Sequence, residues 1–251
     1  MPGAGAERPA LRAGRAWLAW GVAFCAAPLL AAAQGLVPPL DAQGQLSPRW
    51  QVAGLPQQKP ALTRYAAARV EGRAAVQIDA AASYGNLVLD AAGQAAPRHV
   101  AWSWRLEQPN PATDLRQKAG DDTAARVCLS FELPLDRVPF VERQMLRMAR
   151  DLSSRQLPAA TLCWVWGGPE PRDTVIDNPY SRRLRYLVLR GQADGVGRWF
   201  NERRDVAADF RRAFGDESAE LPPLAAVIVA GDADNTGRQS RAYVAGLSFE
   251  P

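Results

Sequence analysis

Histidine is almost absent from this sequence: among 251 residues, His99 is the only one. A transition-metal site built from several histidines is therefore excluded, and any histidine-dependent catalytic triad would rest on this one side chain. The patterns G-x-S-x-G, H-E-x-x-H, C-x-x-C and G-x-x-x-x-G-K-[ST] do not occur either. Their absence removes the usual sequence signatures of α/β-hydrolases, zinc proteases, dithiol redox proteins and P-loop nucleotide-binding proteins.

Lysine is nearly as scarce. Lys59 and Lys118 are the only lysines among 30 basic residues, which face 26 acidic residues and give a formal net charge of +4. Hydrophobic residues make up 47% and charged residues 22% of the chain, which is ordinary for a globular protein and excludes global disorder. The 20 glycines and 20 prolines favour a fold with many loops. The length fits one large domain or two small ones.

Long apolar runs are missing except near the N-terminus. Three arginines between positions 8 and 15 precede an apolar run over residues 16–30, and three alanines follow it. A basic start, a short apolar run and an alanine cleavage site predict a secretory signal peptide at 1–33. The run is shorter than the roughly 20 residues of a membrane-spanning helix. We expect cleavage after Ala33 and a periplasmic or secreted mature protein with no stable membrane anchor.

Removal of residues 1–33 would leave 27 basic and 25 acidic residues. This nearly balanced charge does not favour electrostatic attraction of the mature chain to nucleic acid or to an anionic membrane. We therefore expect no nucleic-acid partner.

Short runs typical of β-strands recur along the mature chain, separated by glycine, proline, aspartate and asparagine. In several of them apolar side chains alternate, as Val100, Trp102 and Trp104 do. Many short strands with frequent turns predict a mainly β protein: an antiparallel β-sandwich or jelly roll over residues 50–251, after an extended leader at 34–49. The expected strands are 64–70, 74–79, 84–89, 100–107, 124–132, 161–166, 183–190, 224–229 and 242–249.

Two segments have helical spacing instead. In 139–153, Val141, Met145 and Met148 fall on one face, and a proline stands near the start. In 196–214, apolar residues form another stripe before Gly215, and arginines occupy the polar side. We expect two helical insertions in the sandwich.

Two cysteines remain in the mature chain, Cys128 and Cys163, each within an expected strand. An oxidising compartment would permit a disulfide between them. Two buried thiols that act as small hydrophobic side chains are an equally good interpretation. The sequence leaves both possibilities open.

Several stretches together resemble bacterial domain-of-unknown-function family 3047. They are KAGDDTAARVCLSF at 118–131, WVWGG at 164–168, DNPYSRRLRYLVLRG at 177–191, GRWFNERRDVAADFRRAFG at 197–215 and GDADNTG at 231–237. The resemblance implies an exported protein of about this size with a sandwich similar to galactose-binding-like and carbohydrate-binding modules. It assigns no chemical role to any residue, and its members typically lack a cysteine where Cys128 stands.

A group of polar residues is the best candidate for ligand binding. One of the two lysines, two adjacent carboxylates and an arginine fall just before and within an expected strand, a set similar to that which grips sugar hydroxyls. Tryptophans on nearby strands would supply stacking surfaces, although alternating aromatics are also typical of a core. The alternative is a turn held by side-chain-to-backbone hydrogen bonds. The candidate ligand-binding residues are Lys118, Asp121, Asp122, Arg126, Trp164, Asn178 and Tyr180.

A second motif resembles half of a calcium loop. Asp232, Asp234 and Thr236 place oxygen side chains at alternate positions before Gly237. Tyr243 stands where an EF-hand has its bidentate glutamate, so an EF-hand is excluded. We expect a tight hairpin turn between strands 224–229 and 242–249, neutralised by hydrogen bonds and nearby arginines. Calcium is the one cofactor that the motif leaves open; otherwise we expect none.

These observations favour a non-catalytic β-sandwich protein of the cell envelope that binds a glycan or another small polar ligand. Two alternatives belong to other classes. One is an envelope polysaccharide hydrolase that uses a pair of carboxylates. The other is a structural or interaction protein whose helices dock a partner. The oligomeric state does not follow from the sequence.

Overall fold

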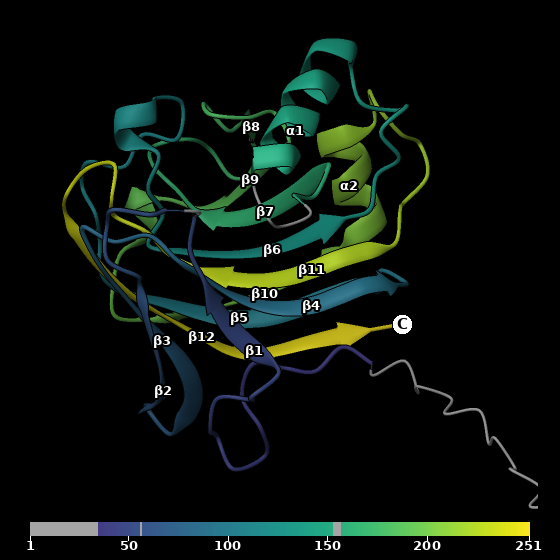
Figure 1. The fold of residues 1–251 in the computed structure, drawn as a ribbon. Helices are drawn as coiled ribbons and strands as arrows, with labels where there is room; N and C mark the ends of the chain where they lie inside the picture. Colours follow the sequence, from purple (N-terminus) through teal and green to yellow (C-terminus); the bar gives the residue numbers. More distant parts are fainter. Residues whose placement is uncertain (1–34, 56, 153–156) are drawn as a thin grey trace, which may run out of the picture. The chain divides into compact units, whose positions relative to one another are not determined.

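The computed structural model describes residues 35–55, 57–152 and 157–251. They belong to one compact unit, Gln34–Pro251, which is distinct from Met1–Ala33. The predicted signal peptide and its cleavage site lie outside the described residues. Figure 1 shows two layers of strands in this unit, with the helices α1 and α2 beside them. Within the described ranges, no helix is long and apolar enough to cross a membrane.

The strands form two sheets, and neighbouring strands are antiparallel except β7 and β9, which run parallel. The seven-stranded sheet has the order β1 (Trp50–Ala53), β4 (Asn86–Gln94), β11 (Leu224–Ala230), β6 (Ala125–Phe131), β7 (Ala160–Trp166), β9 (Leu184–Arg190) and β8 (Val175–Asp177). The five-stranded sheet has the order β10 (Trp199–Asp205), β5 (His99–Gln108), β12 (Gln239–Glu250), β3 (Arg73–Ala81) and β2 (Arg64–Val70).

Tryptophans fill the core between the two sheets. On β5, Trp102 and Trp104 point inward because alternate residues of a strand face the same side. Trp102 meets Trp104 edge-on and packs against Trp164 of β7, with ring centroids 5.4 Å apart in both pairs. The buried rings hold the sheets together and give each layer an apolar inner face.

Strands β6 and β7 are buried at every residue, which explains their nearly continuous apolar sequences. Their inner face belongs to the main core. On the other face, Leu115, Val165 and Ile176 belong to a second apolar cluster. The seven-stranded sheet is therefore covered on both sides at its centre.

The predicted helix over 139–153 is present as α1, Phe140–Leu152. The second prediction, a helix over 196–214, is wrong in its first half. Residues Trp199–Asp205 form β10, which pairs with β5 along its whole length, and only Val206–Phe214 form the helix α2. Asp205 begins α2, because its carboxylate accepts a hydrogen bond from the backbone N–H of Ala208 at 2.8 Å.

The fold class expected from the sequence is confirmed: a mainly β sandwich with two α-helices. The expected hairpin between 224–229 and 242–249 is wrong. Strand β11 lies in the seven-stranded sheet and β12 in the five-stranded one, so residues 231–238 carry the chain from one layer to the other. At Gly231 a side chain would collide with the backbone of Ala124, which is why the crossing begins on a glycine.

Candidate functional site

Three connecting segments meet beside the start of β6. They are residues 118–124, which lead into β6, residues 178–183, which lead into β9, and the crossing segment 231–238. Asn178 donates its side-chain N–H to Asp121 at 2.6 Å. Asn235 donates its backbone N–H to Asp122 at 3.1 Å. Polar side chains from distant parts of the sequence therefore form one network.

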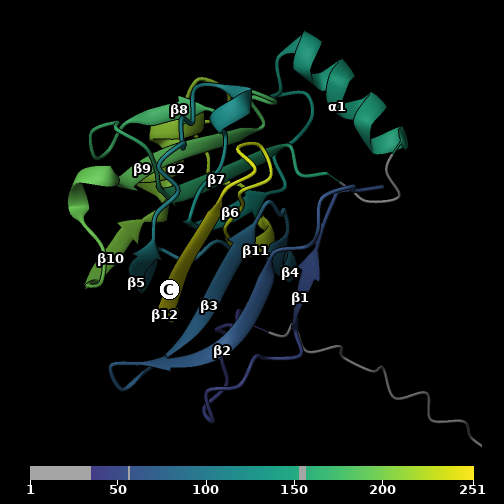
Figure 2. The same cartoon turned by 90° about the vertical axis from the view of Figure 1, so that its left-hand side faces the viewer.

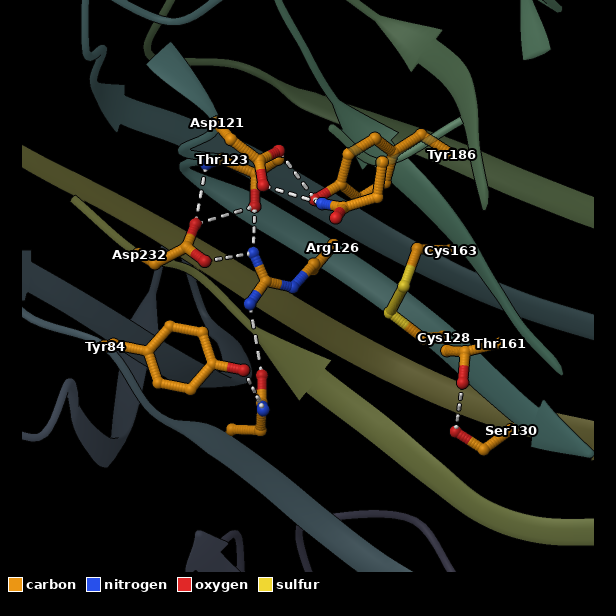
Figure 3. The surroundings of a disulfide bond; sticks show 12 residues. Tyr84, Asp121, Thr123, Arg126, Cys128, Ser130, Thr161, Cys163, Tyr186 and Asp232 are labelled. Carbon is orange, nitrogen blue, oxygen red and sulfur yellow. Dashed lines mark hydrogen bonds and ion pairs between the residues drawn. A yellow bond between two sulfur atoms is a disulfide. The ribbon is translucent and has the colours of Figure 1, made fainter. Parts of the chain in front are cut away.

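An ion pair between Arg126 and Asp232 lies at the centre of this network (Figure 3). The Arg126 Nη1 atom is 2.6 Å from the Asp232 carboxylate, and both side chains are about 95% buried. Thr123 donates its backbone N–H to the same carboxylate at 2.7 Å. On its other side, Arg126 donates to the amide oxygen of Asn86 on β4. Both charges are therefore compensated. The ion pair and its hydrogen bonds connect β6, β4 and the crossing segment.

Asp121 is enclosed next to this pair. Its two carboxylate oxygens accept hydrogen bonds from the hydroxyl of Tyr186, at 2.9 Å, and from Asn178. Burial raises the pKa of the Asp121 carboxyl to about 6, although both hydrogen bonds favour the ionised form. The carboxyl is oriented by neighbours on β9 and on the segment before it, and is only 6% exposed.

Asp122 is completely buried and holds the crossing segment. Its carboxylate accepts backbone N–H groups from Asn235 and from Thr236, at 3.1 and 2.8 Å, and a side-chain N–H from Asn110. Direct contact between Asp122 and a ligand, expected from the sequence, is therefore not what the geometry supports. The carboxylate acts as a cap for the turn that follows Asp234.

Two further candidates, Trp164 and Tyr180, differ in their exposure to solvent. Trp164 does not reach a surface: it is fully buried in the core and donates its indole N–H to Asp209 at 2.8 Å. Its assignment as a ligand platform is corrected for that reason. Tyr180 is 56% exposed and donates its hydroxyl to Asn235 at 2.6 Å, and the Lys118 ammonium lies 5.1 Å from its ring. Lys118 and Tyr180 thus lie at the exposed margin of the network.

The oxygens of the half calcium loop are directed to different partners. Asp232 is bound to Arg126, and the Thr236 hydroxyl accepts from the side chain of Asn110 at 3.0 Å. Neither Arg238 nor Arg241 forms the ion pair that neutralises the loop; Arg241 pairs instead with Asp79. Among the described residues, no group of three or more histidine, cysteine, aspartate or glutamate side chains is arranged to hold a metal ion.

The two cysteines form a disulfide between directly paired residues of β6 and β7 (Figure 3). Cys128 and Cys163 have Cα atoms 4.0 Å apart. Because side chains alternate along β6, Arg126 and Cys128 face the same side, away from the main core. The disulfide therefore lies in the second apolar cluster, beside the polar network.

A pocket of about 180 Å³ adjoins the network. Asn110 belongs to both, because it lines the pocket and donates to Asp122 and Thr236. Trp166, Leu106 and two prolines give the pocket apolar walls, while Thr113 and Gln192 contribute neutral polar groups. The described residues that line it are Leu106, Pro109, Asn110, Pro111, Thr113, Ala124, Trp166, Gly167, Gln192, Gly195 and Val196.

The family described as "Protein of unknown function (DUF3047)" matches residues 48–248. The chain belongs to this family. No curated protein matches it.

Among solved structures, the chain is similar to endoglucanase 3 of family GH12 from Trichoderma harzianum, at 9% identity and a TM-score of 0.39, covering 82% of this chain and 100% of that chain. It is also similar to the endoglucanase Cel12A from Rhodothermus marinus, at 14% identity and a TM-score of 0.38, covering 82% of this chain and 97% of that one.

The pocket was not predicted from the sequence, although part of a signal exists. Pro109-Asn110-Pro111 is a turn signature directly after a strand, and an ordered turn of this kind can form a wall. The opposite wall comes from residues 192–196, more than 80 positions later, within a stretch that we interpreted partly as helix. The pairing of β10 with β5 helps to bring the two walls together, and the backbone hydrogen bond from Gln192 to Gly168 adds to it.

Asp234 provides a pH-dependent test of the network. One of its carboxylate oxygens is buried without a hydrogen-bond partner among the described residues, and burial, followed by Asp232 and Asp122, raises the pKa of the carboxyl from 3.8 to about 6. A raised carboxyl pKa means that stability is full below about pH 4 and is lost as the pH rises through about 6. Asp234→Asn should therefore raise the free energy of unfolding by about 1 kcal/mol at about pH 7.5, a figure reduced for partial exposure, and by nothing near pH 4.

Urea unfolding of both proteins at several pH values between about 4 and 7.5 measures this difference. Glu250→Gln is the control with the opposite sign, since Arg203 lowers the pKa of the Glu250 carboxyl. That variant should lose stability at neutral pH, and the loss should shrink as the pH falls. If Asp234→Asn changed the free energy of unfolding equally at every pH, the raised pKa of the Asp234 carboxyl would be wrong.

Proposed function

We propose that this protein is an exported, non-catalytic binding protein whose pocket takes a neutral glycan unit. The observation that carries the proposal is the composition of the pocket, in which Trp166 and apolar walls stand with the neutral polar side chains of Thr113 and Gln192. A sugar ring has an apolar face and a rim of hydroxyls, so it needs both kinds of surface. Concave sites with apolar walls and a few polar groups are the usual form of small-ligand sites.

The size of the pocket limits the ligand. Its volume of about 180 Å³ is below the roughly 300–1,000 Å³ of sites for drug-sized ligands. We infer that one ring, or one ring at the end of a longer chain, enters it. The absence of charged side chains among the described residues of the lining favours a neutral sugar over a uronic acid or an amino sugar.

Export is supported by two independent features. The N-terminal sequence has the pattern of a signal peptide, and the disulfide between Cys128 and Cys163 is of a kind that persists in oxidising compartments. Together they favour a location in the periplasm or outside the cell.

Binding is favoured over hydrolysis by the positions of the carboxylates. A hydrolase of the kind considered above needs two carboxylates facing one cleft. None of the described residues that line the pocket carries a carboxylate, and Asp121, Asp122 and Asp232 are hydrogen-bonded within the network instead. We therefore do not propose a hydrolytic reaction for this pocket.

Titration with neutral monosaccharides and short oligosaccharides, followed by calorimetry and by tryptophan fluorescence, tests the proposal. We expect saturable binding that weakens about threefold to tenfold in Thr113→Val and again in Gln192→Ala, because each removes one hydrogen-bonding group. Uronic acids and amino sugars should bind more weakly than neutral sugars.

Thr174→Val is the matched control, because Thr174 is a partly buried threonine outside the pocket. It should leave affinity unchanged. Failure of every neutral sugar in the panel to bind, or equal binding by Thr113→Val, Gln192→Ala and the unchanged protein, would rule out this pocket as the glycan site.

A further inference from the structure

Helix α1 is oriented unusually, with polar side chains toward the sandwich. Glu142 forms ion pairs with Arg183 and with Arg182 of the segment before β9. Near the other end, Arg150 donates two hydrogen bonds to the backbone carbonyl of Leu157, at 2.6 and 2.8 Å. Among the α1 side chains that the structure describes, Leu146 is buried and joins the main core. Ion pairs and hydrogen bonds therefore hold α1 in place together with the burial of Leu146.

The apolar stripe of α1 points the other way. Val141, Met145 and Met148 are 67%, 57% and 63% exposed, and their spacing of four and three residues places them on one face. Phe140 at the start of the helix is 65% exposed. Figure 2 shows α1 at the outer edge of the unit. An exposed apolar face of this kind marks an interaction surface, because soluble proteins rarely leave large apolar side chains together in water.

The charged side chains beside this stripe are of both signs. Arg137 and Arg147 are exposed, and the Arg143 guanidinium lies 5.7 Å from the Phe140 ring. Asp136 and Asp151 are the exposed acids of this region, while the charge of Glu142 is paired with Arg183. The surface around the apolar stripe therefore carries three arginines against two aspartates, a small positive excess.

We propose that α1 docks on the surface of a membrane that contains anionic phospholipid. A helix with one apolar face, low mean hydropathy and arginines on its polar side is the type that lies in the headgroup region, with the apolar face inserted about 5–10 Å. The methionines of the stripe can adapt to an irregular apolar environment. Arginines beside it match the negative charge of the headgroups.

The nearly balanced net charge of the mature chain predicts no general attraction to membranes, so binding depends on this helix. One helix of 13 residues gives weak and reversible binding. The proposal is independent of the glycan pocket, because no residue of α1 lines it. The sequence left open that the helices dock a partner, and the proposal names a membrane surface as that partner.

Vesicle flotation tests the proposal. The protein used is Gln34–Pro251, which is one compact unit with both sheets and the disulfide, because the apolar run at 16–30 would itself bind lipid. We expect it to float with vesicles of three parts phosphatidylcholine to one part phosphatidylglycerol. It should not float with phosphatidylcholine alone, and binding should fall when the ionic strength rises from about 0.05 to about 0.5 M.

The double variant Met145→Gln/Met148→Gln should bind at least about fivefold less, since it removes apolar surface while glutamine preserves helix propensity. Val52→Gln/Leu55→Gln is the matched control, because these exposed apolar side chains lie outside α1. Circular dichroism checks that each variant is folded. The control should bind as the unchanged protein does.

Three outcomes would overturn the proposal: no flotation with anionic vesicles, equal flotation of the α1 double variant, or equal binding to phosphatidylcholine alone. Light scattering provides a fourth. A dimer of the unchanged protein that becomes a monomer in the α1 double variant, without a change in flotation, would assign the stripe to a second copy of the chain instead.

Discussion

Arg126→Met is expected to lower the free energy of unfolding by about 3–5 kcal/mol, because it leaves the buried Asp232 carboxylate without its counter-charge. Asp232→Asn should cost a similar amount, since it leaves a buried guanidinium beside a neutral amide. Chemical unfolding monitored by circular dichroism measures both losses.

The double variant Arg126→Met/Asp232→Asn separates the charge from the packing. We expect it to lose clearly less than the sum of the two single variants, because removing both charges removes the need for compensation. Arg203→Met is the matched control: it breaks the exposed pair with Glu250 and should cost little. Additive losses in the double variant would mean that Arg126 and Asp232 contribute through packing alone.

The second large effect concerns the disulfide. Cys128 and Cys163 are 35 residues apart in sequence, and closing a loop of that length stabilises a folded protein by about 3–4 kcal/mol in the chain-entropy account. Unfolding in the presence of dithiothreitol should therefore show a loss of this size relative to the oxidised protein.

Both sulfurs are buried, so reduction must be verified by a free-thiol assay under unfolding conditions. Cys128→Ala/Cys163→Ala is the control, because without cysteines its stability cannot respond to dithiothreitol. A fully reduced protein with the same unfolding midpoint as the oxidised one would contradict the expected contribution of the loop closure.

Local patterns predict much of this fold. The alternation of Val100, Trp102 and Trp104 identifies a strand with one buried face, and β5 has that form. The spacing of Val141, Met145 and Met148 identifies α1. Both patterns depend on residues close in sequence, which is why they can be interpreted without knowing what the segment packs against.

Features that depend on distant residues were missed. The stripe from Trp199 to Phe214 fits a helix, but pairing with β5 draws its first half into a sheet. The spacing on α1 shows which residues share a face, but not that this face is exposed, as it is at Val141, Met145 and Met148. Local periodicity shows which residues of a helix or strand share a face, but not what that face packs against.

In the candidate network, too, the sequence predicts local features but not the contacts between distant residues. Most of its residues stand in three short segments that the sequence singles out, yet the contact between Arg126 and Asp232 joins positions 106 residues apart. Nothing near Arg126 in the sequence indicates that partner. The pocket is further from prediction still, because its walls acquire their shape from the pairing of β5 and β10.

The placement of the last two strands has a consequence for the order in which the chain can fold. Strand β11 lies between β4 and β6, and β12 lies between β3 and β5, so each sheet stays divided into two parts until residues 224–250 are available. Pairings between such distant segments form late, because their loops must close first. A chain with this topology is expected to stay largely unfolded throughout synthesis. With the export that we propose, this delay would keep the chain unfolded, and so able to pass through a secretion channel, until its last strands have crossed.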